Sequence, residues 1–249
     1  MKLYHQLAEY YYAIENKHRD IADDILLIKE LLGGKRNPTL LDLGCGTGEH
    51  MNQLQQLGFR CTGIDKSRDM LRIAQMRFPH SGIFLEGDIA TFDYFEDFDI
   101  IISLFGTFNY IIEDETIVRV LWNSWKAMKP GGIGLFEVWN AIPIGKIQEK
   151  PLGHISTTKF QGVVIDRERG FSLIDGKKTI VKVNYRYTVS TDGFQEKVLD
   201  KHIMRAFQRE EIEGFIRESG FSIRNVYANS LREPYRETSN RMILHFVKE

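Results

Sequence analysis

Five short, almost continuously apolar runs alternate with helical patterns between residues 39 and 139. Strands this apolar are buried on both faces, because a strand with one face in water alternates apolar with polar residues. Strands separated by helices are typical of a parallel sheet that is covered on both sides. The pattern therefore predicts a doubly wound α/β fold, with strands at 39–44, 60–65, 82–87, 98–105 and 131–139.

The segments between these runs carry apolar residues at helical spacing. Met51, Leu54 and Leu57 predict the buried face of one helix, and Ser67 is placed to cap the next. A further helix is predicted before the first strand, on Ile21, Ile25, Ile28 and Leu32.

The pattern changes after residue 150. Four β-like runs, 155–166, 170–175, 178–190 and 194–207, follow one another without helices, with turn residues at Asp175-Gly176 and Asp192-Gly193. They predict an antiparallel insert, and two final runs, 221–227 and 242–248, return the chain to the core sheet. We interpret the chain as a helical cap (1–37), a core (38–150 and 207–249) and an antiparallel β insert (151–206).

Composition excludes few classes of protein. Thirty-three basic and thirty-four acidic residues give a net charge of -1, whereas proteins that grip a phosphate backbone usually carry a basic excess. Two cysteines, Cys45 and Cys61, fit free thiols in a reducing compartment. No run suits a signal peptide or a membrane helix. A cytoplasmic enzyme or binding protein is expected, and nucleic acid is an unfavoured partner.

The run LLDLGCGTGEH, residues 40–50, ends the first strand and opens a helix. Gly44, Gly46 and Gly48 allow tight turning and close approach of the backbone to a ligand. Their G-x-G-x-G spacing differs from the G-x-G-x-x-G of dinucleotide-binding folds, which argues against a dehydrogenase. Asp42 precedes the loop on the strand.

Two more acids follow strand ends. Asp65 ends the second strand, where a carboxylate can accept hydrogen bonds from ribose hydroxyls. Asp88 follows the third strand and can accept from an exocyclic amine, while the Ile89 N–H can donate to a ring nitrogen. Each acid alone is more often a cap or turn residue, but three such features along one carboxyl edge favour an adenosine-containing ligand.

The glycine loop LDLGCGTG, the acid in GIDKS, the GDI turn and the KPGG before the fifth strand together resemble the class I S-adenosylmethionine-dependent methyltransferases. The resemblance implies a seven-stranded, mostly parallel sheet whose last strand is antiparallel, with S-adenosylmethionine along strands one to four. It implies cofactor contacts from Tyr11, Arg19, Asp42, Gly44, Cys45, Gly46, Gly48, Asp65, Lys66, Met70, Asp88, Ile89 and Leu104.

The N-terminal flank and the insert resemble enzymes that N-methylate nucleotide-linked amino sugars. In that group a tyrosine and a basic residue fold over the cofactor, and Tyr11 and Arg19 stand at the matching places. Tyr12 departs from the pattern by replacing an aspartate. Half-buried packing of the run Tyr10 to Tyr12 is the alternative.

The run SLFGTFNYI, residues 103–111, follows the fourth strand. Many methyltransferases place the residues that contact the methyl acceptor at this point of the fold. It lacks the Pro-Pro of enzymes that methylate flipped bases. Tyr110 and Tyr11 are the candidate catalytic residues, expected to orient the acceptor and close the site rather than act as strong bases. Asn109 is the other polar residue in reach, and turn closure is its alternative role. No residues show metal-ligand spacing, so no metal is expected.

The sequence thus predicts methyl transfer from S-adenosylmethionine to a small molecule. An amine is favoured because no His–Asp pair stands out as a base for a hydroxyl acceptor. Residues 155–206 hold ten Lys and Arg against six Asp and Glu, which suits a phosphorylated handle or, alternatively, solvated strand faces. O-methylation, RNA or protein methylation and a non-catalytic binding module stay open. The insert is expected to form either a wall of the acceptor pocket or an oligomer contact, the latter giving a homodimer.

Overall fold

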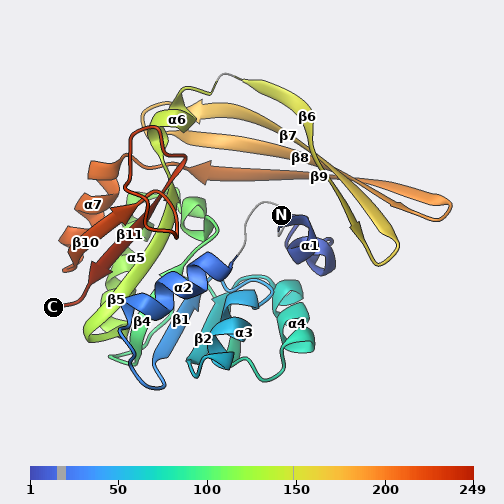
Figure 1. The fold of residues 1–249 in the computed structure, drawn as a ribbon. Coiled ribbons are helices and arrows are strands. Elements are labelled where there is room, and N and C mark those ends of the chain that lie inside the picture. Colours follow the sequence, from blue (N-terminus) through green and yellow to red (C-terminus); the bar gives the residue numbers. More distant parts are fainter. Residues whose placement is uncertain (16–20, 148) are drawn as a thin grey trace.

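The computed structural model describes residues 1–15, 21–147 and 149–249. It contains a seven-stranded sheet and a separate four-stranded sheet, as Figure 1 shows. The order of the larger sheet is β10-β11-β5-β4-β1-β2-β3. Its strands are β1 (Thr39–Leu43), β2 (Arg60–Asp65), β3 (Ile83–Glu86), β4 (Phe98–Ser103), β5 (Met128–Trp139), β10 (Ser222–Tyr227) and β11 (Arg241–Val247).

The strand directions confirm the predicted fold class. Strands β3, β2, β1, β4 and β5 pair in parallel, whereas β11 is antiparallel to both β5 and β10. The chain proceeds outward from β1 to β3 and then crosses to β4 on the other side of β1. Open α/β sheets bind ligands outside the carboxyl ends of the strands at such a reversal of strand order.

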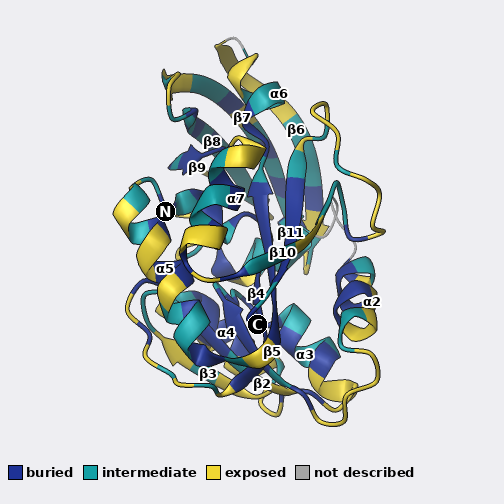
Figure 2. Ribbon diagram, turned by 90° about the vertical axis from the view of Figure 1, so that its left-hand side faces the viewer, coloured by how far each residue is buried: buried dark blue, intermediate teal, exposed yellow. Residues whose placement is uncertain are grey.

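Helices cover both faces of this sheet because successive strand residues point to opposite sides. Leu40 and Ile100 pack with helices α2 and α3, whereas Leu41 and Ile101 pack with α5 and α7. Figure 2 shows the core strands as buried between helices whose outer sides are exposed. The helices are η1 (Ala8–Tyr10), α1 (Tyr11–Glu15), α2 (Ala22–Leu31), α3 (Glu49–Gln56), α4 (Arg68–Arg77), η2 (Thr107–Tyr110), α5 (Asp114–Ala127), α6 (Ala141–Gly145) and α7 (Arg209–Glu218).

One residue predicted for a buried helix face is not buried. Leu57 is 47% exposed, because α3 ends at Gln56 and the chain turns at Gly58 with a φ of 89°. Ser67 does cap α4, since its side chain accepts a hydrogen bond from the Met70 N–H.

The four-stranded antiparallel sheet has the order β6-β7-β8-β9 and extends beyond the core (Figure 1). Its turns after Asp175 and at Asp192-Gly193 were predicted. The prediction of a single strand over 155–166 is wrong, because Gln161 and Gly162, with φ of 49° and 79°, form a tight hairpin turn within it. The strands are β6 (Lys150–Phe160), β7 (Val163–Asp175), β8 (Ile180–Thr191) and β9 (Phe194–Arg205).

The N-terminal residues lie between the two sheets. Leu3, Leu7 and Ile14 are buried against the inner face of the insert, where Val183 and Tyr187 meet them. On the other side Ala8, at the start of η1, packs against Met70 and Ile73 of α4. Helix α2 instead packs on α3, so the segment interpreted as a single cap has two packing partners.

A buried arginine holds the insert where it returns to the core. Arg205, at the end of β9, is 1% exposed and donates to the Ile112 carbonyl at 2.7 Å. It also pairs with Asp114 of α5 and Glu211 of α7, each at 2.5 Å. The arginine is buried while Asp114 is 47% and Glu211 30% exposed, so the two carboxylates anchor it from the rim of the junction.

No helix within the described residues is long and apolar enough to cross a membrane.

Gly134 tests the packing of the core sheet. It faces Phe246 across the β5–β11 pair, and a Cβ added there would lie 2.0 Å from the ring. We expect Gly134→Ala to lower the free energy of unfolding by about 1–3 kcal/mol, as overpacking of a core usually does. Urea denaturation measures this change. Gly153→Ala in β6 is the control, since nothing lies within 4 Å of its Cβ position. Equal midpoints for Gly134→Ala and wild type would contradict the assigned packing.

Candidate functional site

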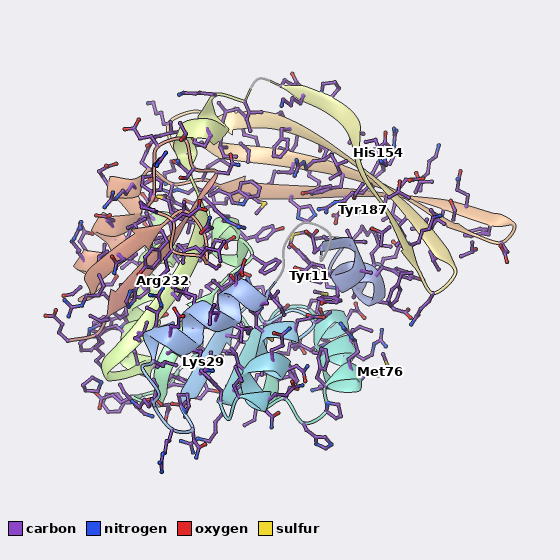
Figure 3. The ribbon with its side chains drawn as sticks, viewed as in Figure 1. Tyr11, Lys29, Met76, His154, Tyr187 and Arg232 are labelled. Atoms are coloured by element: carbon purple, nitrogen blue, oxygen red, sulfur yellow. The ribbon has the colours of Figure 1, made fainter. Side chains whose placement is uncertain are left out.

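The carboxyl ends of β1, β2, β3 and β4 meet at one edge of the core sheet, and the N-terminal segment lies over them (Figure 1). Tyr11, at the start of α1, lies between the core and the insert in Figure 3. Three cavities occupy this region, and all three are lined by Tyr11 and Phe105.

The glycine loop brings its backbone to this edge. Gly44 and Gly46 have φ of 85° and 54°, a region that L-residues rarely adopt. A Cβ on Gly46 would lie 3.4 Å from the Met70 Cε, so a side chain there would fill the cleft. The Gly46 N–H donates to Asp65 Oδ2 at 2.9 Å, which ties the loop to the end of β2.

Two of the three cavities share Gly44 and Gly46 and form one groove, here called the cofactor groove. It extends from Asp42 and His50 at one end to Asp88 and Ile89 at the other. Eleven of the thirteen contacts implied by the resemblance line it: Tyr11, Asp42, Gly44, Cys45, Gly46, Asp65, Lys66, Met70, Asp88, Ile89 and Leu104.

Of the remaining two contacts, Gly48 does not line the groove. Gly48 packs elsewhere, since a Cβ on it would lie 2.9 Å from the Phe84 ring, so its left-handed φ of 82° serves helix–strand packing. Arg19 lies outside the described residues.

Three of the carboxylates that line the groove lie in different environments. Burial raises the pKa of Asp42 to about 6, against the opposing charge of His50. Burial also raises the pKa of Asp65, although the Ser67 and Gly46 N–H groups act against it. Asp88 is more exposed, and despite its partial burial the Ala90 N–H and the Lys66 ammonium, at 2.8 and 2.9 Å, hold its pKa below the usual range. The groove is thus an acidic, partly desolvated site that suits a cationic ligand with a sugar.

The third cavity, here called the acceptor cavity, opens on the groove between Tyr4, Tyr11 and Tyr110. Its volume is about 460 Å³, which is enough for a small molecule. Its walls come from the N-terminal segment, β5 and the inner face of the insert: Leu3, Tyr4, Tyr11, Glu15, Phe105, Tyr110, Glu137, Trp139, Ile155, Arg167, Arg169, Tyr185, His202, Met204 and Arg241.

Charges of both signs line this cavity. Arg167 is 5% exposed and pairs with Glu15 at 2.9 Å, with its guanidinium 4.6 Å from the centre of the Tyr185 ring. Within the described part of the chain its Nε has no hydrogen-bond partner. Glu137 of β5 is buried, and Arg241 of β11 lies 3.8 Å from it. A ligand with both an amine and an anionic group would find partners for each.

Not every basic residue of the insert faces the cavity. Arg167 and Arg169 line it, but Lys182 and Arg186 alternate with the inward-facing Val181 to Tyr187 and lie on the opposite face of β8. Arg186 pairs there with Glu168. For Lys182 and Arg186 the alternative of solvated strand faces therefore fits, since neither lines the cavity.

The loop after β4 separates the groove from the acceptor cavity. Phe105 has a φ of 55°, unusual for a bulky residue, and Gly106 follows at 77°. Sparsely populated backbone conformations of this kind cluster at functional sites. Asn109 is fully buried and donates to the Arg205 carbonyl at 2.7 Å, so it closes the turn and does not reach the cavity.

Tyr110 belongs to a hydrogen-bonded cluster that the sequence did not reveal. Its hydroxyl lies 2.8 Å from that of Tyr4 and 2.5 Å from Nδ1 of His202, whose Nε2 is 3.0 Å from Asp200. The expectation that no His–Asp pair is present is wrong. The signal was the i, i+2 spacing of Asp200 and His202, which puts both on one face of a strand.

No group of three His, Cys, Asp or Glu side chains in the described residues could hold a metal ion.

Comparison with known proteins gives consistent results. Residues 40–132 match the family model described as a methyltransferase domain. A dTDP-4-amino-2,3,4,6-tetradeoxy-D-glucose N,N-dimethyltransferase of Saccharopolyspora spinosa is 28% identical over 182 residues, 73% of this chain and 70% of that protein.

Solved structures share the whole fold. An S-adenosylmethionine-dependent methyltransferase from Clostridium acetobutylicum has a TM-score of 0.83 at 19% identity and covers 98% of both chains. CalS10, an amino pentose methyltransferase of Micromonospora echinaspora solved with the cofactor bound, has a TM-score of 0.76 at 19% identity, over 96% of this chain and 97% of that one.

Sheet order, glycine loop and acidic groove define a class I methyltransferase fold whose cofactor is S-adenosylmethionine. More narrowly, residues 40–132 of the chain match a methyltransferase domain.

Asp65→Ala tests the sugar end of the groove. Hydrogen bonds to a charged group contribute about 1.5–3 kcal/mol, so we expect S-adenosylmethionine affinity to fall tenfold or more. Isothermal titration calorimetry measures it. Asp93→Ala, which removes an 81% exposed carboxylate away from the groove, should bind as wild type does. Wild-type affinity in Asp65→Ala would remove Asp65 from the cofactor site.

Proposed function

We propose that the enzyme methylates an amino group of a small molecule that carries an anionic handle, such as a nucleotide-linked amino sugar. The observation that carries this proposal is the acceptor cavity, which has buried charges of both signs and opens on the cofactor groove at three tyrosines. The relative from Saccharopolyspora spinosa, by its name, acts on an acceptor of this kind.

The residues of the groove have distinct proposed roles toward S-adenosylmethionine. Asp65 accepts from the ribose hydroxyls, Asp88 from the adenine amine, and the Ile89 N–H donates to the ring. Asp42, whose pKa burial raises to about 6, is stabilised as a carboxylate by an amino-acid ammonium beside it. The backbone at Gly46 leaves room for the ligand, whereas a Cβ at Gly44 would lie 2.4 Å from the Thr107 side chain.

When bound, S-adenosylmethionine would supply a methyl group on a positively charged sulfur, so that a neutral amine could attack the methyl carbon and displace the sulfur. The chain contributes alignment and exclusion of water, which lower the barrier without a covalent catalyst. Tyr11 and Tyr110 line both the groove and the acceptor cavity and are proposed to orient the acceptor nitrogen. Burial raises the pKa of both phenols well above the ordinary value, so they stay protonated and do not act as anionic bases.

The charged residues of the acceptor cavity are proposed to recognise the acceptor. Glu137 and Glu15 suit the protonated amine of an incoming acceptor, and Arg167, Arg169 and Arg241 suit phosphate oxygens. The cofactor groove itself is acidic, so an anionic handle is directed away from it.

Product analysis with a panel of acceptors tests this function. We expect methyl groups on nitrogen of amino sugars, with faster turnover of phosphorylated or nucleotide-linked forms. Release of S-adenosylhomocysteine measures turnover, and mass spectrometry locates the methyl group. Methylation only of oxygen, RNA or protein, or no turnover of any acceptor, would contradict the proposal and favour one of the alternatives.

Arg169→Gln tests the anionic handle within the same assay. We expect KM for a phosphorylated amine acceptor to rise about tenfold, since a charged hydrogen bond is lost. KM for the matching acceptor without phosphate should stay unchanged. Lys182→Gln, on the opposite face of the insert, is the matched control. An equal effect on both acceptors would argue against a phosphate contact.

A homodimer through the insert, in a cytoplasmic setting, is part of the proposal. Strand β9 presents Leu199, 67% exposed, on the outer face of the insert, opposite to the buried Val198 and His202. Both cysteines are free thiols, as a reducing compartment requires. We expect sedimentation to give twice the chain mass for wild type and a monomer for Leu199→Lys. A wild-type monomer would contradict the dimer.

A further inference from the structure

A chain of four polar side chains crosses from the acceptor cavity into the insert. The hydroxyls of Tyr4 and Tyr110 lie 2.8 Å apart, and Tyr110 lies 2.5 Å from Nδ1 of His202. The Nε2 of His202 lies 3.0 Å from Asp200 Oδ2, which also accepts the Leu3 N–H at 2.7 Å. His202 is 2% exposed, whereas Tyr4 and Tyr110 line both the groove and the acceptor cavity.

The charge of Asp200 fixes the direction of every hydrogen bond in this chain. Although burial acts to raise it, contacts with His202 and with backbone N–H groups hold the pKa of Asp200 well below the ordinary value, so its oxygens only accept. His202 Nε2 must then carry a proton, which in the neutral ring leaves Nδ1 as an acceptor for the Tyr110 hydroxyl. Since the single proton of Tyr110 is used there, Tyr4 donates to Tyr110.

Tyr4 therefore donates to Tyr110, and Tyr110 donates to His202, so both hydrogen bonds point in the same direction. The first oxygen of this series, on Tyr4, has lone pairs toward the cavity and is bonded within the described residues only as a donor to Tyr110. Burial raises the pKa of both phenols, so neither holds a negative charge. His202 ends the series, because its Nδ1 lone pair can accept the proton while the Asp200 carboxylate lies beside its Nε2.

We infer that Tyr4, Tyr110 and His202 form a proton relay that converts the bound acceptor from an ammonium ion to a neutral amine before methyl transfer. The inference rests on the proposed function, because it requires an amine acceptor. It assigns Tyr4, beside the orienting Tyr11 and Tyr110, as the group that receives the proton of the acceptor nitrogen. Tyr110 and His202 pass that proton on, and Asp200 is a positioning residue that holds the histidine ring and its tautomer.

The proton balance is closed without any further reactant. The ammonium gives a proton to the Tyr4 oxygen, the Tyr4 proton moves to Tyr110, and the Tyr110 proton moves to Nδ1 of His202. The amine lone pair then forms the N–C bond while the S–C bond breaks and its electron pair stays on sulfur. The new ammonium leaves as the product or loses its proton to water. His202 returns its proton along the same chain to solvent after release.

Several charged or titratable groups set the field at His202. Asp200 lies on its own strand, Tyr185 faces it from β8, Tyr110 from η2 and Tyr4 from the N-terminal segment. Behind Tyr185 lie Arg167 and Glu15, which pair with each other and so contribute little net charge.

The test is the pH dependence of kcat/KM in His202→Asn, measured with an aliphatic amine acceptor that wild type methylates. The amide oxygen can still accept from Tyr110 but cannot be protonated. Loss of a general base costs about 10²–10⁴-fold, so we expect a deficit of that size at pH 7. The deficit should shrink about tenfold per pH unit toward the pKa of the free amine, where the acceptor is already neutral. A purely structural role would give a loss that does not depend on pH.

Two further variants keep the test independent of one substitution. Tyr110→Phe retains the ring but breaks the relay, and should show the same pH-dependent deficit. His154→Gln removes an exposed histidine of β6, labelled in Figure 3, and should keep the wild-type profile. Calorimetry should give wild-type S-adenosylmethionine affinity for His202→Asn. A wild-type pH profile in His202→Asn, or a deficit that is constant with pH, would overturn the relay.

Nuclear magnetic resonance of protein labelled with ¹⁵N-histidine adds a readout that needs no acceptor. We expect the signal missing from His202→Asn to show an Nε2–H tautomer at pH 8. An Nδ1–H tautomer, or an imidazolium at that pH, would overturn the relay even if amines are methylated. Wild-type protein that methylates no amine would instead overturn the proposed function, and the relay with it.

Discussion

The packing of the N-terminal segment between the core and the insert holds both halves of the site together. Leu3, Leu7 and Ile14 are almost completely buried, and each such apolar side chain stabilises the docked segment by about 1.5–3 kcal/mol. The same segment supplies Tyr4 and Tyr11, which stand where the groove meets the acceptor cavity. Without this contact the cofactor edge would be open to water, and the insert would have no inner surface to close against.

Charge is divided between the two parts of the site. The groove holds carboxylates on strand ends, which suits a ligand with a positive sulfur and an ammonium group. The insert holds arginines on its inner face. One of them, Arg167, pairs with Glu15 of the N-terminal segment. The groove is therefore acidic and the cavity carries charges of both signs, while uncharged aromatic rings occupy the boundary between the two.

The sequence predicted the features that depend on neighbouring residues in the chain. The apolar period of β1 to β5, the Ser67 cap and the glycines at strand ends are local patterns, and the acids at strand ends follow from the parallel sheet they imply. The turn at Gln161-Gly162 was missed because glutamine rarely adopts a left-handed conformation. Tyr4, Tyr110 and His202 are separated by up to 198 residues in the sequence. They come together only because the N-terminal segment packs between the core and the insert. The face of the insert on which Lys182 and Arg186 lie depends on strand register, and register cannot be predicted from composition.

The junction at Arg205 has an evolutionary consequence. The insert leaves the core after β5 and returns at Arg205, which is anchored to α5 and α7, so the insert is one continuous stretch of the chain. Residues of this stretch that line the cavity without packing on the N-terminal segment, such as Arg169, can change while this anchor and the glycine loop stay as they are. Selection can therefore adapt such a chain to a new acceptor through a short, contiguous stretch of its gene, leaving the machinery that handles the methyl donor intact.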